Sequence, residues 1–149
     1  MTTKEKITLG WREWGSLPEL NILAIKVKID TGAKTSALHA FDIEAFQKNQ
    51  KEFLRFKVHP KQNDEDCIVH CEAPIVEQRQ ITNSGGHKEM RYVIETKLVL
   101  ANKEWPIEIT LTSRRNMRFR MLLGRRAMVD YALVDPSASY LCGKLKNKI

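Results

Sequence analysis

Long apolar runs are absent from this 149-residue sequence, and so are the features of an exported protein. The longest apolar stretches, Ile22–Ile25 and Met121–Leu123, fall far short of the roughly 20 residues that a membrane-spanning helix needs. The first ten residues hold no apolar segment typical of a secretory signal. Three cysteines, an odd number, do not make a disulfide framework, so reduced thiols are expected. These absences predict a cytoplasmic protein without membrane contact.

Two common motifs for nucleotides and metals are also missing. No Gly-x-x-x-x-Gly-Lys-Ser/Thr loop is present, because Gly143-Lys144 lacks the earlier glycine, and none of the four histidines begins His-Glu-x-x-His. Cys67, His70 and Cys71 lie close in sequence. On a strand the two cysteines face one side and His70 the other, which favours buried thiols beside an edge histidine over a metal site. We therefore predict no metal and no cofactor.

The charge is strongly basic, with 25 Lys and Arg against 18 Asp and Glu. Such a surface attracts nucleic acid, anionic membrane or acidic polypeptide. The densest basic segment is 114–120, where Phe119 offers a ring for base stacking. Solvated strand faces are the favoured explanation, because Arg118 and Arg120 alternate with Phe119 and Met121. Nucleic acid is accordingly not the expected partner, and an acidic peptide suits the same charges.

Period-2 alternation recurs along the chain and predicts short strands. The predicted strands are 25–29, 54–59, 67–71, 75–76, 91–100, 107–111, 118–122 and 131–134. Helical patterning is scarce and predicts only a helix at Asp42–Asn49 and a short turn at Arg125–Val129. The glycine-rich segment Asn83–Lys88 predicts a hairpin tip. Seven or eight strands joined by turns predict one all-β barrel or sandwich domain spanning 1–149.

The sharpest motif is Asp30-Thr31-Gly32-Ala33, directly after a predicted strand. A carboxylate at the end of a buried strand is costly unless it accepts hydrogen bonds. Gly32 lets backbone amides approach that carboxylate, and Thr31 offers a hydroxyl to hold the turn. An ordinary strand-ending turn remains an alternative interpretation of these four residues.

A second segment, Met121-Leu122-Leu123-Gly124-Arg125-Arg126, places a glycine after apolar residues. Together with the Asp30 turn it resembles the retropepsin-like aspartic protease family. The wider strings 28–40, 110–114, 121–128 and 134–136 resemble the bacterial family labelled ATP-dependent zinc protease. The resemblance, which runs from about Trp11 to Leu141, implies a closed six-stranded acid-protease barrel with a short helical turn after Gly124.

The resemblance implies an aspartic endopeptidase that cleaves peptide bonds. Two carboxylates must share one proton around a water, and the chain has one such turn, so a homodimer would supply Asp30 twice. The implied catalytic residues are Asp30, Thr31 and Gly32. The implied substrate-binding residues, with a flap at the hairpin tip, are Ala33, Ser84, Gly85, Gly86, Leu123, Gly124 and Arg125. The substrate is expected to be a peptide or protein, held largely as an added strand.

Two departures from the retroviral pattern bear on this interpretation. Lys34 stands where that pattern has an acidic partner for the later arginine, so Arg125 is expected to pair with Asp130 or Glu13. An apparent insertion at 41–66 is expected to cover the site or to replace dimer contacts. A non-catalytic peptide-binding or regulatory barrel and a zinc-dependent hydrolase stay open as alternatives. By family resemblance, an ATP-grasp ligase that adds amino acids to peptides is a further expected partner.

Overall fold

The computed structural model describes residues 5–62, 64–82, 85–113 and 118–143. Across these residues the chain is all-β, as predicted, with one short α-helix. The strands are β1 (Ile7–Leu9), β2 (Arg12–Leu17), β3 (Ile22–Ile29), β4 (Ser36–His39), β5 (Phe41–Lys48), β6 (Lys51–Val58), β7 (Val69–Thr82), β8 (Lys88–Leu100), β9 (Lys103–Thr112), β10 (Met121–Leu123) and β11 (Ala132–Val134). A 3₁₀ turn, η1, spans Pro18–Leu20, and the helix α1 spans Arg125–Met128.

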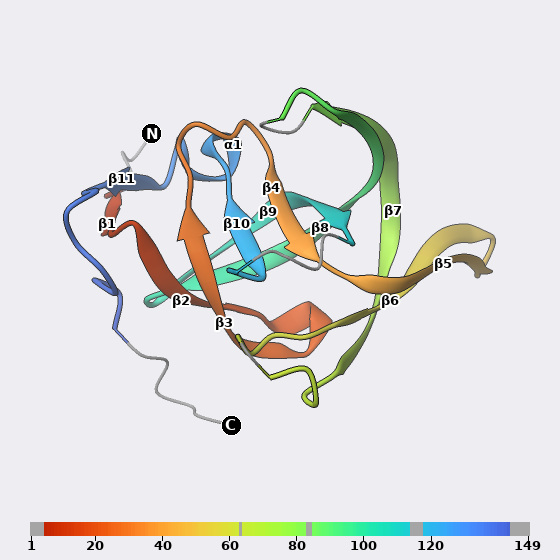
Figure 1. The fold of residues 1–149 in the computed structure, drawn as a ribbon. Coiled ribbons are helices and arrows are strands. Elements are labelled where there is room, and N and C mark those ends of the chain that lie inside the picture. Colours follow the sequence, from red (N-terminus) through yellow and green to blue (C-terminus); the bar gives the residue numbers. More distant parts are fainter. Residues whose placement is uncertain (1–4, 63, 83–84, 114–117, 144–149) are drawn as a thin grey trace.

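One strongly bent sheet holds nine of these strands (Figure 1). Their order is β2-β3-β10-β4-β9-β8-β7-β6-β5, and β2 also pairs with β8 through Ser16 and Val99. The remaining strands, β1 and β11, form a separate parallel pair. β10 lies parallel to β3 and antiparallel to β4, so this late segment fills the gap between two early strands. The fold thereby brings residues almost 100 positions apart to the same place.

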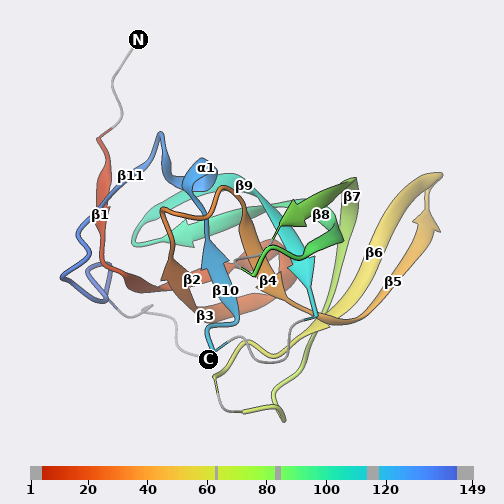
Figure 2. The same cartoon turned by 45° about the horizontal axis from the view of Figure 1, so that its top comes forward.

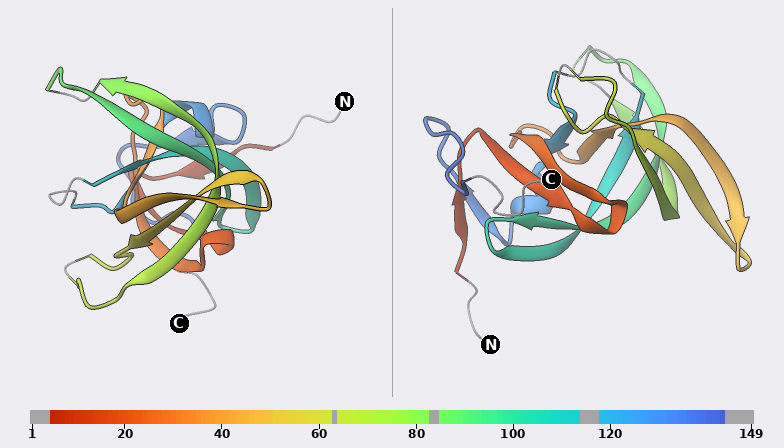
Figure 3. Two further views of the ribbon diagram at one scale, coloured as in Figure 1. Left: turned by 90° about the vertical axis from the view of Figure 1, so that its right-hand side faces the viewer. Right: turned by 90° about the horizontal axis from the view of Figure 1, so that it is seen from below.

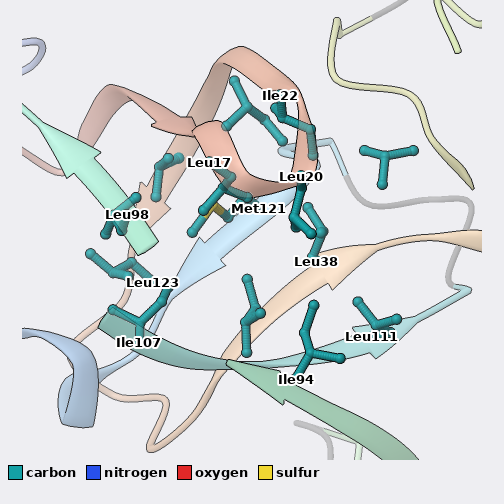
Figure 4. Packing of buried hydrophobic residues seen from close by; sticks show 14 of the residues in the cluster. Leu17, Leu20, Ile22, Leu38, Ile94, Leu98, Ile107, Leu111, Met121 and Leu123 are labelled. Carbon is teal, nitrogen blue, oxygen red and sulfur yellow. The ribbon is translucent and has the colours of Figure 1, made fainter. Parts of the chain in front are cut away.

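The hydrophobic core fills the inside of this bent sheet (Figure 4). Leu38, Ile94, Met121 and Leu123 come from four different strands and are buried against one another in one cluster. On β10, Met121 and Leu123 are buried and flank half-buried Leu122, whereas all four residues of β4 are buried. The core therefore fixes β10 in its place between β3 and β4.

The helix predicted at Asp42–Asn49 is wrong, because this segment is strand β5. Ile43 and Phe46 have helical spacing, but the segment instead forms a hairpin with β6. The ring of Phe46 lies 6.0 Å from that of Phe53 on the facing strand. The hairpin extends away from the rest of the sheet (Figures 2 and 3). The apparent insertion is therefore a projecting hairpin.

Several predicted strand boundaries are corrected by the structure. β10 begins at Met121 rather than at 118, and β7 begins at Val69 rather than at 67. β9 begins at Lys103, so Pro106 lies inside a strand instead of before it. Proline lacks a backbone donor, but β9 pairs with β4 only at 109–112, so among the described residues Pro106 is paired with β8 alone. The predicted turn after Gly124 is confirmed as α1.

No helix among the described residues is long and apolar enough to cross a membrane.

Candidate functional site

The Asp30 turn follows β3 and is held by its own backbone. The Asp30 amide donates to the Leu123 carbonyl at 2.9 Å, which fixes the end of β3 against β10. The Asp30 carboxylate oxygen Oδ1 accepts the amides of Gly32 at 3.0 Å and Ala33 at 3.2 Å. These are the backbone contacts expected from the glycine. Thr31 is exposed, and within the described part of the chain its hydroxyl makes no hydrogen bond, contrary to expectation.

Gly124 lets the second segment pass directly against this turn. A Cβ at Gly124 would lie 2.5 Å from the carbonyl carbon of Thr35 and 3.0 Å from the carbonyl oxygen of Ala33. Because both neighbours are backbone atoms, no side-chain motion relieves such a contact. The Gly124 amide donates to the Ser36 hydroxyl at 3.0 Å, and the Arg125 amide donates to Ala33 at 2.7 Å. The two sequence motifs therefore form one locked unit.

Arg125 has a different partner from the two expected. Its guanidinium donates to the Thr31 carbonyl at 3.0 Å, instead of pairing with Asp130 or Glu13. Glu13 is fully buried and accepts three backbone amides, those of Gly10, Leu141 and Cys142. Its carboxylate is thus saturated by the chain itself. Arg125 therefore stabilises the Asp30 turn from outside. The acidic residue that would pair with this arginine in the retroviral pattern is replaced by Lys34.

A cleft of about 580 Å³ opens beside the Asp30 turn. The cleft lies between the Asp30 turn and the hairpin of β7 and β8. Figure 1 shows the loop after β3 and this hairpin at the same end of the molecule. The lining residues are Asp30, Gly32, Ala33, Lys34, Thr35, Ala37, Arg79, Gln80, Ile81, Thr82, Arg91, Thr112, Leu122 and Arg126. Four of these side chains are cationic and one is a carboxylate, so the cleft favours anionic ligands.

The implied substrate-binding residues are placed unevenly. Ala33 lines the cleft, whereas Leu123 is buried in the core and Leu122 lines the cleft in its place. Gly124 and Arg125 support the turn from outside the lining. Of the expected flap, Ser84 lies outside the described residues. Gly85 and Gly86 are exposed at the hairpin tip, outside the lining that Gln80, Ile81 and Thr82 provide just before it.

Two basic residues of the cleft, Arg79 and Arg91, were missed by the sequence analysis. Arg79 and Arg91 lie directly opposite each other on β7 and β8. The Arg79 guanidinium donates to Glu77 at 2.9 Å and to Glu108 at 3.1 Å, and these bonds raise its pKa. Arg91 is 7% exposed, and its Nη2 donates to Glu89 at 3.4 Å. Strand alternation places Arg91 on the inner face, but its role depends on pairing that the sequence alone does not reveal.

The cysteines and His70 form no cluster. Cys71 is buried and donates to the Leu20 carbonyl at 3.3 Å, whereas His70 is exposed on the other face of β7. Burial raises the pKa of Cys71 to about 12, and burial together with Glu13 raises that of Cys142 to about 11. Across the described residues no group of three or more His, Cys, Asp or Glu side chains could hold a metal ion. Buried His39 instead stacks on Phe41 and His59.

The Asp30 turn and the glycine crossing define a protein of the retropepsin-like class. The chain belongs to the RimB-like family, described as "Retropepsin-like aspartic endopeptidase RimB", whose model matches residues 8–144. The label ATP-dependent zinc protease is not supported by this match. A similar fold occurs in the crystal structure of a Legionella pneumophila protein "with unknown function", with a TM-score of 0.79 and 28% identity. The alignment covers 93% of this chain and 99% of that one.

Curated relatives carry a different name, "Probable alpha-L-glutamate ligase". The relative from Parasynechococcus marenigrum is 50% identical over 95% of this chain, and that from Desulfotalea psychrophila is 46% identical over 96%. The relative from Shewanella pealeana is 42% identical over 93%. The chain spans about 30% of the length of these relatives.

These names contradict the sequence-based prediction of an aspartic endopeptidase, together with its hydrolase and protease assignment. A ligase forms a bond that a peptidase would break, and the alternative of a zinc hydrolase conflicts with the ligase name in the same way. The error has a physical source. The Asp30 motif specifies the geometry of a turn and its hydrogen bonds, whereas a reaction depends on the whole site around that turn.

Proposed function

We propose that this chain takes part in α-L-glutamate ligation, where it holds the glutamate-bearing polypeptide on which the ligase acts. One observation carries the proposal. Relatives named as glutamate ligases are 42–50% identical to this chain over almost all of it. The matched part is about 30% of their length. We therefore assign ligation to the remaining part of those proteins and binding of the acceptor polypeptide to the part shared with this chain.

Peptide-bond formation requires an activated carboxyl group, which a ligase obtains from a nucleotide. We assign that activation to a ligase partner of the ATP-grasp kind, the partner implied by the family resemblance. This chain then contributes the positioning of the acceptor, which lowers the entropic cost of bringing two reactants together.

The charge of the cleft supports a glutamate-bearing ligand. Lys34 and Arg126 lie on the side of the Asp30 turn, and Arg79 and Arg91 lie on the hairpin side. A ligand with several carboxylates meets positive charge on both sides, while Asp30 supplies the single negative charge of the lining. Such an arrangement steers an acidic polypeptide toward the cleft and weakens in salt.

The cleft offers two binding places for the backbone of a peptide ligand. Asp30 Oδ1 is occupied by the Gly32 and Ala33 amides, which leaves Oδ2 to accept a ligand amide. β7 pairs with β6 only at 69–74, so beyond that range its pairing is with β8 alone and its other edge has no strand beside it among the described residues. Gln80–Thr82 on this edge line the cleft, where an extended peptide would add as a strand.

Finer features of the fold belong to the same proposal. The pairing of Ser16 with Val99 supports closure of β2, β3, β10, β4, β9 and β8 into a six-stranded barrel. We propose that residues 1–149 form one retropepsin-like domain and that the chain is cytoplasmic, where its cysteines stay reduced. The homodimer expected from the sequence stays a prediction, which sedimentation measures directly.

The proposed function is tested by calorimetric titration with two peptides whose termini are both uncharged, N-acetyl-tri-α-L-glutamate amide and N-acetyl-triglutamine amide. The proposal predicts that the glutamate peptide binds at least about tenfold more tightly and that its affinity falls as salt rises. Lys34→Gln is a suitable variant, because Lys34 is exposed and its loss should weaken only the glutamate peptide. Equal affinity for the two peptides would overturn the proposal.

A further inference from the structure

Three polar side chains form a row across the floor of the hairpin side of the cleft. Arg79 lies opposite Arg91 on β7 and β8, and Val93 lies opposite Thr110 on β8 and β9. The pairing of β8 with β9 ends at Val93 and Thr110, and Arg91 and Thr112 each stand two residues beyond these partners, on the same faces of their strands. Arg79, Arg91 and Thr112 all line the cleft.

Two atoms of this row are buried without a hydrogen bond. Arg91 is 7% exposed and Thr112 is 2% exposed. Throughout the described chain, neither Arg91 Nε nor Thr112 Oγ1 has a hydrogen-bond partner. Buried polar groups are almost always satisfied, so two unsatisfied ones on residues that line one cleft point to a ligand of that cleft.

Arg79, the arginine opposite Arg91, has carboxylate partners for its guanidinium. Arg79 donates to two carboxylates, Glu77 and Glu108, within 3.1 Å. Among the described residues, Arg91 has one carboxylate partner, Glu89, which its Nη2 contacts at 3.4 Å. Because like charges directly opposed in a sheet repel, a further anion between them stabilises the row. Arg91 therefore retains its Nε–H for a ligand.

We propose that Arg91 and Thr112 form a carboxylate-binding subsite that receives the side chain of a glutamyl residue. The Arg91 Nε–H and the Thr112 hydroxyl are the two donors that this carboxylate would satisfy, and the charge of the guanidinium strengthens the first of these bonds. This inference rests on the proposed function, since it names the residues that select the acidic side chain. Asp30, on the other side of the same cleft, is left to accept an amide of the ligand backbone.

Thr112→Val separates this role from a structural one. Valine keeps the shape of threonine but lacks the hydroxyl, and that hydroxyl has no partner to lose in the free protein. The thermal midpoint is therefore expected to hold or rise, while affinity for N-acetyl-tri-α-L-glutamate amide falls about tenfold. Thr112→Ser restores the donor and should recover the affinity. Unchanged affinity in Thr112→Val, with wild-type binding intact, overturns the subsite and leaves the proposed function standing.

Two further ligands separate the possible sources of the carboxylate and the two proposals. N-acetyl-triglutamine with a free carboxyl terminus carries only a terminal carboxylate, and it should bind wild type and Thr112→Val equally. Glutarate, a small dicarboxylate, should shift the Arg91 Nε–H resonance in nuclear magnetic resonance spectra. A glutarate shift without any binding of the glutamate peptide would retain the subsite and overturn the proposed function. No glutarate shift at Arg91 would overturn the subsite.

Discussion

The two sides of the cleft differ in how completely the chain satisfies its own polar groups. On one side, Asp30 accepts two backbone amides, and the Gly124 crossing holds the turn with further backbone bonds. On the other side, Arg91 is buried with an unused Nε. The first side is built for rigidity, and the second keeps donors for a ligand. The comparison teaches that the most recognisable motif need not be the part of the site that selects the ligand.

The largest effect is expected from breaking the rigid side with Gly124→Ala. The added Cβ would lie 2.5 Å from a backbone carbon of Thr35, and neither segment can yield without losing its hydrogen bonds. We expect the free energy of unfolding to fall by about 3 kcal/mol or more in urea titrations. Gly32→Ala is the matched control, since its Cβ meets only the Asp30 side chain, at 3.3 Å, and should cost below about 1 kcal/mol. Similar losses in both variants would contradict a crossing locked by backbone contacts.

The next effect distinguishes the two opposed arginines. Arg91→Met should reduce affinity for the tri-α-L-glutamate peptide about 30-fold, because a desolvated charged donor is lost. Its free energy of unfolding should hold or rise, since Glu89 stays partly solvated and an apolar side chain suits the buried position.

Arg79→Met is the counterpart of that variant. It breaks two partly exposed ion pairs and should lower the free energy of unfolding by up to about 1 kcal/mol. Affinity should fall only about threefold, from the loss of one screened charge. Calorimetry and urea unfolding on both variants provide the check, and an affinity loss at Arg79 equal to that at Arg91 would remove the distinction.

A smaller loss of affinity is expected at Asp30. Asp30→Asn keeps an oxygen for the Gly32 and Ala33 amides, so the turn should persist. The variant removes the single negative charge of the lining, which favours the glutamate peptide, but it also replaces Oδ2, the proposed acceptor of a ligand amide, by an NH2 donor. Affinity for the glutamate peptide should therefore fall about twofold, and a rise in affinity with an unchanged thermal midpoint would contradict the assignment of Oδ2 as that acceptor.

The smallest effect concerns a buried donor outside the cleft. The Cys71 thiol has a partner in the Leu20 carbonyl, and burial raises its pKa to about 12. Its thiolate is therefore scarce at pH 8, and a thiol reagent should label half-buried Cys67 first.

The raised pKa of Cys71 also makes the free energy of unfolding depend on pH. Because this pKa is higher in the folded chain than in the unfolded chain, the stabilisation by the protonated thiol is present below pH 9 and is lost as the pH rises toward 12. Cys71→Ala should lessen that alkaline decline, and rapid labelling of the double variant Cys67→Ser with Cys142→Ser at pH 8 would contradict the account.

The sequence predicted the rigid side of the site and missed the ligand-selecting side. Asp30 and Gly124 stand in short motifs, so their residue types alone indicate a turn and a close approach. Arg91 stands in an ordinary strand, and its place in the site depends on Arg79 lying opposite it on β7 and on Thr112 of β9 lining the same cleft. The β5 segment was misassigned for a related reason, because its pairing with β6 overrides a weak helical spacing.

The most direct test follows one titration from both sides of the cleft. Uniformly ¹⁵N-labelled protein is titrated with N-acetyl-tri-α-L-glutamate amide, while the Gly32 amide and the Arg91 Nε–H are observed together. The account predicts that both resonances shift along curves with a single common Kd, because one ligand spans the cleft. Shifts at Gly32 with none at Arg91, or two clearly different Kd values, would contradict it.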